Sequence, residues 1–467
     1  MAVAFDDLRD WSERLGTLAA AHGVPGAALG ILRLGGAAAG SGDDLTAVAT
    51  GVLNKATGVT VTPDSVFQIG SISKVWTTTL AMQLVDEGLL DLDRPVVDVL
   101  PELALADAEA TASITLRHLL SHSSGLDGDA FLDTGRGDDA LQRFVAELRT
   151  QPQLFPPGSA FSYCNAGFGI VGRVIEVVLG LDWDTALRQR LIQPLGLTGT
   201  STLPEEAILR RAAVGHLGEP GADAYPTTSW MFARCAGPAG LVNSTVADLL
   251  TFVRMHLAGG VHTDGGRVLS QRSADEMQQP QIGLPAGLAH DGARCLGWWR
   301  ERWSGSVRFG HDGAVIGQYA YLDVLPEHGF AVALFTNGPG ANNLWAQLRP
   351  ELWSALAGVD VPGPVEPPAQ APAVDLGRHV GSYGRRGHRL AVSESAGRLV
   401  VHVDEDWGAA AGKHAYDLEL VPVDQDLFVT RMPNADVWSP LRFGRLPDDR
   451  DFVYHLGRVN ARSAGSS

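Results

Sequence analysis

Two spacings of hydrophobic residues follow one another along the chain, and together they predict an α/β domain. Apolar residues recur at helical spacing over residues 5–22, 71–87 and 341–357, and over four segments of the middle third, 140–150, 168–179, 184–192 and 246–257. Strand-like runs lie before and after these four segments, at 26–34, 45–53, 65–69, 306–310, 316–324 and 329–337. We therefore expect one sheet domain that is interrupted by a helical insertion.

The last quarter of the chain is patterned differently. Five prolines between positions 362 and 372 predict a linker over residues 359–374, which leaves 1–358 as the first domain. Short alternating runs then predict an all-β domain of about six to eight strands over residues 375–467. These runs are 389–393, 398–403, 416–421, 427–431, 441–444 and 451–456.

Composition narrows the class of protein. The 467 residues are 45% hydrophobic and carry a formal net charge of −17, which disfavours nucleic acids and anionic membranes as partners. No apolar run reaches the ~18 residues that a membrane span needs, and residues 1–10 lack the basic and apolar stretches of a signal peptide. The three cysteines are too few and too scattered for a disulfide framework or a zinc ribbon. We expect a cytoplasmic enzyme.

Lysine is rare in this chain, which draws attention to the lysines that remain. Of 36 basic residues only Lys55, Lys74 and Lys413 are lysines. Lys74 follows Ser71 by three positions at the start of a predicted helix, so the hydroxyl and the amine can meet on one face. Apolar neighbours would desolvate Lys74 and lower its pKa, and a neutral amine can act as a base toward Ser71. The alternative is an ordinary surface lysine.

Two further motifs carry chemistry, each with a structural alternative. Tyr163 and Asn165 open the helix predicted over 168–179, where a tyrosine can pass protons and an asparagine can hold a substrate amide. The alternative is a packed tyrosine with Asn165 as the helix cap. Gly310 and Gly313 flank His311, so a substrate can approach the backbone closely there. The alternative is a hairpin turn at positions 312–313.

The three motifs together resemble the serine β-lactamase and penicillin-binding-protein superfamily. They are Ser71-x-x-Lys74, Tyr163-x-Asn165 and His311-x-Gly313. Class A members carry S-x-x-K, S-D-N and K-T-G, and this chain departs from the second and third motifs. Its variants are similar to the class C-related branch of esterases, D-aminopeptidases, carboxypeptidases and stand-alone peptide cyclases. Segments 114–126 and 239–249 add to the resemblance, which covers about residues 10–357.

The resemblance implies an antiparallel sheet flanked by helices, an all-helical subdomain and a defined site. Ser71 would be the acylated nucleophile, with Lys74 and Tyr163 activating it and relaying protons. Asn165 would position the substrate, and His311 would assist near the leaving group or a carboxylate.

The resemblance also implies an oxyanion hole formed by the backbone N–H groups of Ser71 and Ala314, beside Gly313. It implies no metal and no cofactor. The pair His118 and His122 has a zinc-like spacing but lacks a third ligand, and no G-x-S-x-G motif of an α/β-hydrolase occurs.

The C-terminal β domain is similar to the lipocalin-like domains that accompany penicillin-binding-protein-type thioesterases. That resemblance implies a peptidyl thioester on a nonribosomal peptide synthetase carrier, with a D-residue at its C-terminus, released by head-to-tail macrocyclisation. The alternatives are a cytoplasmic serine esterase or D-amino-acid-specific peptidase acting on a small ester or peptide, and a catalytically inactive binding module. Arg458 and Arg462 either hold a substrate carboxylate or are solvated surface residues.

Overall fold

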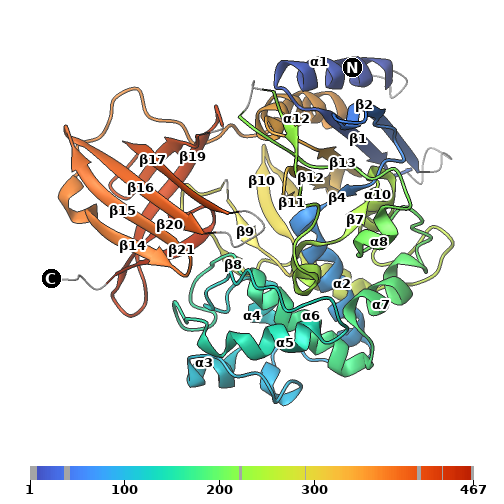
Figure 1. Cartoon of the computed structure of the whole chain (residues 1–467), viewed down its shortest axis with the longest axis horizontal. Coiled ribbons are helices and arrows are strands. Elements are labelled where there is room, and N and C mark those ends of the chain that lie inside the picture. The colour runs from blue at the N-terminus through green and yellow to red at the C-terminus, as the bar shows by residue number, and fades with distance from the viewer. Residues whose placement is uncertain are drawn as a thin grey trace.

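The chain forms two packed parts, an α/β part and then a closed barrel (Figure 1). The computed structural model describes residues 8–35, 43–219, 223–289, 291–406, 412–433 and 435–463. In this described part, a nine-stranded antiparallel sheet has the order β3-β2-β1-β13-β12-β11-β10-β9-β8. Its strands are β1 (Gly26–Arg33), β2 (Asp44–Asn54), β3 (Val59–Thr60), β8 (Ile282–Gly283), β9 (Ala293–Arg294), β10 (Trp299–Trp303), β11 (Ser306–Val315), β12 (Gln318–Leu325) and β13 (Phe330–Thr336).

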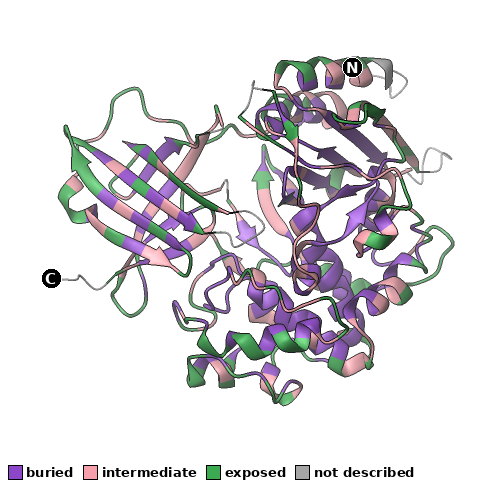
Figure 2. Ribbon diagram, viewed as in Figure 1, coloured by how far each residue is buried: buried purple, intermediate pink, exposed green. Residues whose placement is uncertain are grey.

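Helices cover both faces of this sheet, which explains why its central strands are apolar on both sides. On one face pack α1 (Leu8–Ala21) and α12 (Ala341–Ala357). On the other face pack α2 (Ser73–Asp86) and α10 (Val246–Leu257), and Figure 2 shows the central strands and α2 as buried. Gly30 of β1 allows the close approach of α10, because a Cβ there would lie 2.8 Å from Leu250 Cδ1.

Most of the remaining helices lie in the sequence between the edge strands β3 and β8. These helices are α3 (Ala108–Ser113), α4 (Leu116–Leu120), α5 (Ala140–Glu147), α6 (Asn165–Leu179), α7 (Trp183–Leu187), α8 (Pro204–Ala207), α9 (Gly237–Gly240) and α11 (Gln271–Gln278). Shorter helical turns are η1 (Gly70–Ile72), η2 (Val96–Asp98), η3 (Leu148–Thr150), η4 (Arg188–Ile192), η5 (Arg234–Ala236), η6 (Pro326–His328) and, before the barrel, η7 (Leu376–His379). Two small ladders join β4 (Phe67–Gln68) to β7 (Asn243–Ser244) and β5 (His216–Leu217) to β6 (Tyr225–Pro226).

The C-terminal part is an eight-stranded antiparallel barrel, closed by pairing of its first and last strands. Its strands are β14 (Gly381–Arg385), β15 (His388–Ser395), β16 (Arg398–Asp406), β17 (Lys413–Pro422), β18 (Leu427–Arg431), β19 (Trp438–Arg445), β20 (Asp451–His455) and β21 (Arg458–Arg462). Leucine, valine and aromatic side chains fill its interior. A separate apolar cluster, which includes Phe161 and Tyr454, joins the barrel to the α/β part.

The predicted fold class is confirmed, with three local corrections. Residues 312–313 do not form a hairpin turn, because β11 continues through them and the chain turns at Ile316-Gly317 instead. The run 65–69 yields only the short β4, outside the main sheet. The barrel has two strands that its sequence pattern did not indicate, β14 and β21. Residues 5–7 of the first predicted helix lie outside the described residues. None of the described helices is both long and apolar enough to cross a membrane.

A buried ion pair fixes β11 relative to its neighbours. Asp323 of β12 is fully buried, 2.6 Å from Arg308 of β11 and 2.7 Å from Arg349 of α12, and it accepts a hydrogen bond from Trp353. Burial alone would raise the pKa of Asp323, but the two guanidinium groups outweigh it and hold that pKa at about 2. The carboxylate is therefore ionised at neutral pH.

We expect Asp323→Ala to lower the free energy of unfolding by about 3–5 kcal/mol, because it leaves Arg308 buried without this counter-charge. Urea denaturation followed by circular dichroism measures this loss. The matched control is Glu419→Ala, which breaks an exposed ion pair with Arg398 and should cost less than about 1 kcal/mol. Equal losses in the two variants would contradict the importance of the buried pair.

Candidate active site

Ser71 and Lys74 meet at the junction of η1 and α2, as the sequence predicts. Lys74 Nζ donates hydrogen bonds to Ser71 Oγ at 3.0 Å and to the Ala239 carbonyl oxygen at 2.6 Å. Lys74 is fully buried, whereas Ser71 is half-buried. The interpretation of Lys74 as a surface lysine is therefore wrong.

The surroundings of Lys74 favour its neutral form. Burial is the main cause that holds its pKa well below the ordinary value, and the positive charge of Arg458 acts in the same direction. The amine lies 4.7 Å from the centre of the Tyr163 ring and 5.5 Å from that of Phe168. A neutral amine 3.0 Å from Ser71 Oγ can accept the hydroxyl proton.

Tyr163 lies beside this pair, immediately before the N-cap of α6. Its backbone N–H donates to Gly457 O of the barrel at 3.0 Å, and its ring stacks on His122 at 4.3 Å. Burial raises the pKa of Tyr163, while a hydrogen bond with Ser71 and the charge of Arg458 act in the opposite direction without cancelling it. Tyr163 is therefore protonated at neutral pH, which makes Lys74 the better first base.

Asn165 is connected to the barrel through a buried carboxylate. Its Nδ2 donates to Asp129 at 2.8 Å, and Asp129 lies 2.6 Å from both Arg458 and Arg385. Burial alone would raise the pKa of Asp129, but the two arginines hold that pKa at about 2. The cap of α6 is Cys164, whose Sγ accepts from Gly167 N, so the interpretation of Asn165 as the cap is wrong.

Two glycines allow β11 to lie against η1 and bring two backbone N–H groups together. A Cβ on Gly313 would lie 1.9 Å from Ile69 O and 3.0 Å from Ser71 N. A Cβ on Gly70 would lie 2.6 Å from Ala314 N. The amides of Ser71 and Ala314 are therefore neighbours, as an oxyanion hole requires.

His311 is buried in β11, near Tyr163 and Trp299. The distances between ring centres are 6.2 Å to Tyr163 and 4.4 Å to Trp299. Burial is the main cause that holds the pKa of His311 well below its ordinary value. Its Nδ1 is 2.6 Å from Asp312 O, so Nδ1 carries the proton and Nε2 has a lone pair. Within the described residues, Nε2 has no hydrogen-bond partner.

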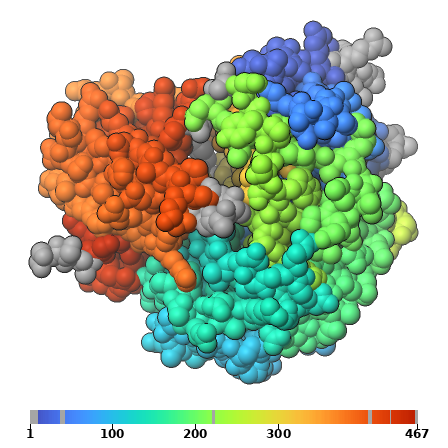
Figure 3. All heavy atoms as spheres, viewed as in Figure 1, coloured from blue at the N-terminus to red at the C-terminus, as the bar shows by residue number. Residues whose placement is uncertain are grey.

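The structure also brings in two residues that the sequence did not single out, Asp129 and Arg385, and it places Arg458 beside them. Asp129 and Arg385 are nearly fully buried at the junction of the two parts, and the Arg458 guanidinium lies 5.0 Å from the centre of the Tyr163 ring. The interpretation of Arg458 as a solvated residue is wrong. Arg462 instead pairs with Asp451 and Val380 O, and its side chain is 36% exposed. Figure 3 shows the surface hollowed between the barrel and the α/β part.

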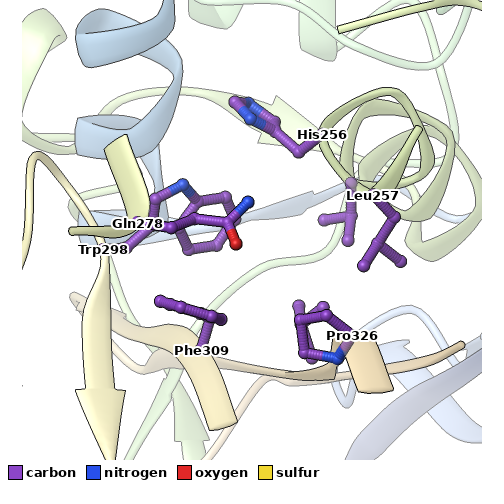
Figure 4. A pocket seen from close by; sticks show the side chains of 8 residues that line it. His256, Leu257, Gln278, Trp298, Phe309 and Pro326 are labelled. Atoms are coloured by element: carbon purple, nitrogen blue, oxygen red, sulfur yellow. The ribbon is translucent and has the colours of Figure 1, made fainter. Parts of the chain in front are cut away.

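The histidine pair has structural roles. His118 completes the cap of α4 with Thr115, and His122 Nδ1 accepts from Cys164 N at 3.0 Å. A small pocket lies elsewhere, lined by Trp298, His256 of α10 and neighbouring apolar residues (Figure 4). Its lining contains none of the residues that surround Ser71, so it is a packing gap and not the substrate site.

Comparison with known proteins identifies the family. Residues 11–357 match the family model described as Beta-lactamase, and the chain belongs to this family. It is 47% identical to Penicillin-binding protein 4 of Amycolatopsis lactamdurans over 389 residues, which are 82% of this chain and 98% of that protein.

Solved structures extend the likeness to the barrel. The crystal structure of SurE superposes with a TM-score of 0.77 at 30% identity and covers 97% of this chain and 99% of that one; a second SurE structure contains D-Leu. D-amino acid amidase from Ochrobactrum anthropi has a TM-score of 0.59 at 25% identity, over 72% of this chain and 92% of that one. The chain is thus a serine enzyme of the β-lactamase fold, a class that hydrolyses or transfers acyl groups of amides and esters.

We expect Lys74→Arg to slow acylation of Ser71 by about 10²–10⁴-fold, because arginine stays protonated and cannot act as a base. Labelling by a serine-reactive probe, followed by mass spectrometry of the intact protein, measures the rate. Lys413→Arg is the matched control, since this lysine is 82% exposed on the barrel. Ser71→Ala should show no labelling and an unchanged circular dichroism spectrum. A near-normal labelling rate in Lys74→Arg would contradict the proposed role of Lys74 as a base.

We expect Gly313→Ala to slow acylation by about 10²–10³-fold, because the added Cβ would push β11 away from η1 and separate the two amides of the oxyanion hole. The same labelling assay measures the rate. Gly283→Ala is the control, since a Cβ at that position meets no atom within 4 Å. Equal rates for the two variants would show that the close approach at Gly313 is not required.

Proposed function

We propose that this enzyme takes a peptidyl thioester, attached to a nonribosomal peptide synthetase carrier, and releases the peptide as a head-to-tail macrocycle. Ser71 Oγ attacks the thioester carbonyl, Lys74 takes the hydroxyl proton, and the C–S bond breaks as the thiol leaves with a proton. The N-terminal amine of the peptide then attacks the acyl-enzyme, an amide bond forms, and the C–O bond to Ser71 breaks as the proton returns to Ser71 Oγ. Tyr163 relays protons between these positions.

The buried ring of His311, whose Nε2 has no hydrogen-bond partner among the described residues, is the observation that carries this proposal. A neutral imidazole with a lone pair on Nε2 can accept a proton from an incoming amine. The neutral ring offers no positive charge to a free C-terminal carboxylate of a substrate. A carboxypeptidase site needs such a charge to bind that carboxylate. His311 therefore favours an amine as the second reactant.

The barrel supports the exclusion of water that cyclisation requires. The segment 161–163 beside Ser71 is hydrogen-bonded to β20, to β21 and to the turn between them. Tyr454 donates to Phe161 O, Val459 N donates to Ser162 Oγ at 3.2 Å, and Tyr163 N donates to Gly457 O at 3.0 Å. The barrel thus forms a wall next to the nucleophile. Such a wall lengthens the life of the acyl-enzyme, so the amine has time to reach it.

The relatives support a D-residue at the acylating end of the peptide. SurE, which is similar over both parts of the chain, has been solved with D-Leu, and the amidase of Ochrobactrum anthropi acts on D-amino acids by its name. Asn165 would hold the substrate amide, with its orientation fixed by Asp129.

The organisation we propose has residues 1–358 as the acyl-transfer domain, 359–374 as the linker and 375–467 as the lipocalin-like domain, acting in the cytoplasm without a cofactor. The second candidate is an esterase or D-amino-acid-specific peptidase that uses the same site. It is favoured by the likeness to D-amino acid amidase, which covers 72% of this chain.

The test uses pantetheine thioesters of one short peptide ending in D-Leu or L-Leu, each with a free or an acetylated N-terminal amine. We expect Ser71-dependent cyclic product from the free-amine D-Leu thioester, at least about tenfold faster than from its L-Leu counterpart. Acetylation removes the nucleophile, so that substrate should yield only the linear acid. Mass spectrometry separates the products because the acid is heavier by one water.

Formation of the linear acid alone from the free-amine D-Leu substrate, at the rate seen with the acetylated one, would reject the cyclase and support the second candidate. Equal rates for D-Leu and L-Leu would reject the proposed stereochemical preference while leaving cyclisation in place.

A further inference from the structure

The interior of the barrel changes from apolar to polar at one end. The inward residues of β15 and β16 are apolar along most of their length, as at Leu390, Val392 and Val401. At the end nearest the α/β part, the cross-strand pair His388 and Glu405 takes their place, and His455 ends β20 close by. These three residues are 5%, 8% and 3% exposed. His388 Nδ1 lies 3.5 Å from Glu405 Oε1, so the cluster brings two imidazoles and a carboxylate together inside the barrel.

The geometry of the cluster fits a metal ion. One nitrogen or oxygen atom from each of His388, Glu405 and His455 lies within 4.8 Å of the others. His388 Nε2 and His455 Nδ1 are 3.4 Å apart, which is long for a hydrogen bond. It is close to the ~3.3 Å that separates two ligand atoms on a tetrahedral ion with bonds of about 2.0 Å.

The hydrogen bonds around the cluster support ligand roles. The hydroxyl of Tyr416 donates to Glu405 Oε1 at 2.9 Å, which fixes the carboxylate as the outer partners of metal ligands do. In the described part of the chain, His455 Nε2 is buried and has no hydrogen-bond partner. The His455 ring stacks on that of His388, and its Nδ1 makes the 3.4 Å contact with His388 Nε2.

We propose that His388, Glu405 and His455 bind a zinc ion at this end of the barrel. Two imidazoles and one carboxylate form a common ligand set for zinc. Water would supply the fourth ligand. The positive charges nearest the cluster are Arg385 and Arg458, and Asp129 pairs with both. Glu405 supplies the negative charge that the ion itself needs.

The ion would join β15, β16 and β20 at the end of the barrel that meets the active site. Arg385 is the register partner of His388, and Arg458 is that of His455. Both arginines hold Asp129, which in turn holds Asn165. The zinc ion would position the barrel and take no part in acyl transfer, so the inference does not depend on the proposed substrate.

The test uses the full chain, stripped with a chelator and titrated with zinc and, as a spectroscopic probe, cobalt(II). We expect about one equivalent of zinc by elemental analysis, a visible cobalt absorption of tetrahedral type, and a rise of the thermal midpoint with zinc concentration. Glu405→Gln and His455→Gln should each weaken zinc binding by at least about tenfold. Probe labelling of Ser71 should proceed in both the zinc-free and the zinc-loaded protein.

The matched control is His402→Gln. His402 lies on the outer surface of β16, the strand that also carries Glu405, and pairs with Asp404 and Asp417. The variant therefore tests for adventitious zinc binding at the surface. Retained binding in this variant, with loss in the two interior variants, supports the proposal. Failure of the wild-type chain to bind zinc at micromolar concentration would overturn it, as would unchanged binding in Glu405→Gln. Circular dichroism of Glu405→Gln, an isosteric change, shows that any loss is not due to unfolding.

Discussion

The arrangement of the candidate site depends on the removal of one amine, that of Lys74, from water. The helices α2, α6 and α9 surround Lys74, and no carboxylate forms an ion pair with it in the described part of the chain. The Ala239 carbonyl accepts one N–H bond and so fixes the direction of the amine without stabilising a full positive charge as a carboxylate would. The same burial keeps Tyr163 protonated and His311 neutral. Lys74, Tyr163 and His311, whose side chains titrate far apart in water, thus form one uncharged arrangement around Ser71.

A second constraint places the barrel against this arrangement. Asp129 is ionised in a buried position because two arginines of the barrel compensate its charge, and it in turn orients Asn165. Removal of the barrel would leave this carboxylate without its counter-charges, at a cost of several kcal/mol. The barrel is therefore part of the site and not an accessory beside it. This dependence is consistent with a likeness to SurE that covers both parts of the chain.

The sequence predicted the elements whose pattern is local. The helices α10 and α12 and the strand β18 have the predicted bounds, because their apolar spacing is complete within each segment. The short strand β14, which pairs with β15 directly after it, was missed because Gly381 and Gly384 weaken its pattern. The turn at Asp312-Gly313 was a reasonable alternative from local chemistry. It is wrong because Gly313 serves a tertiary contact with Ile69 O, which no local pattern reveals.

The difference between local patterns and tertiary contacts also explains which site residues the sequence could reveal. Short sequence motifs contain Ser71, Lys74, Tyr163 and His311. The resemblance of these motifs to a known family therefore predicts that the four side chains lie close together. Asp129, Arg385 and Arg458 carry no motif and meet only because the barrel docks on segment 161–163. From the sequence alone, a charged side chain at any of these positions is interpreted as a solvated surface residue. The structural role of these residues arises from their burial. An ion pair that contributes little to stability in water becomes a strong constraint on the structure once water is excluded.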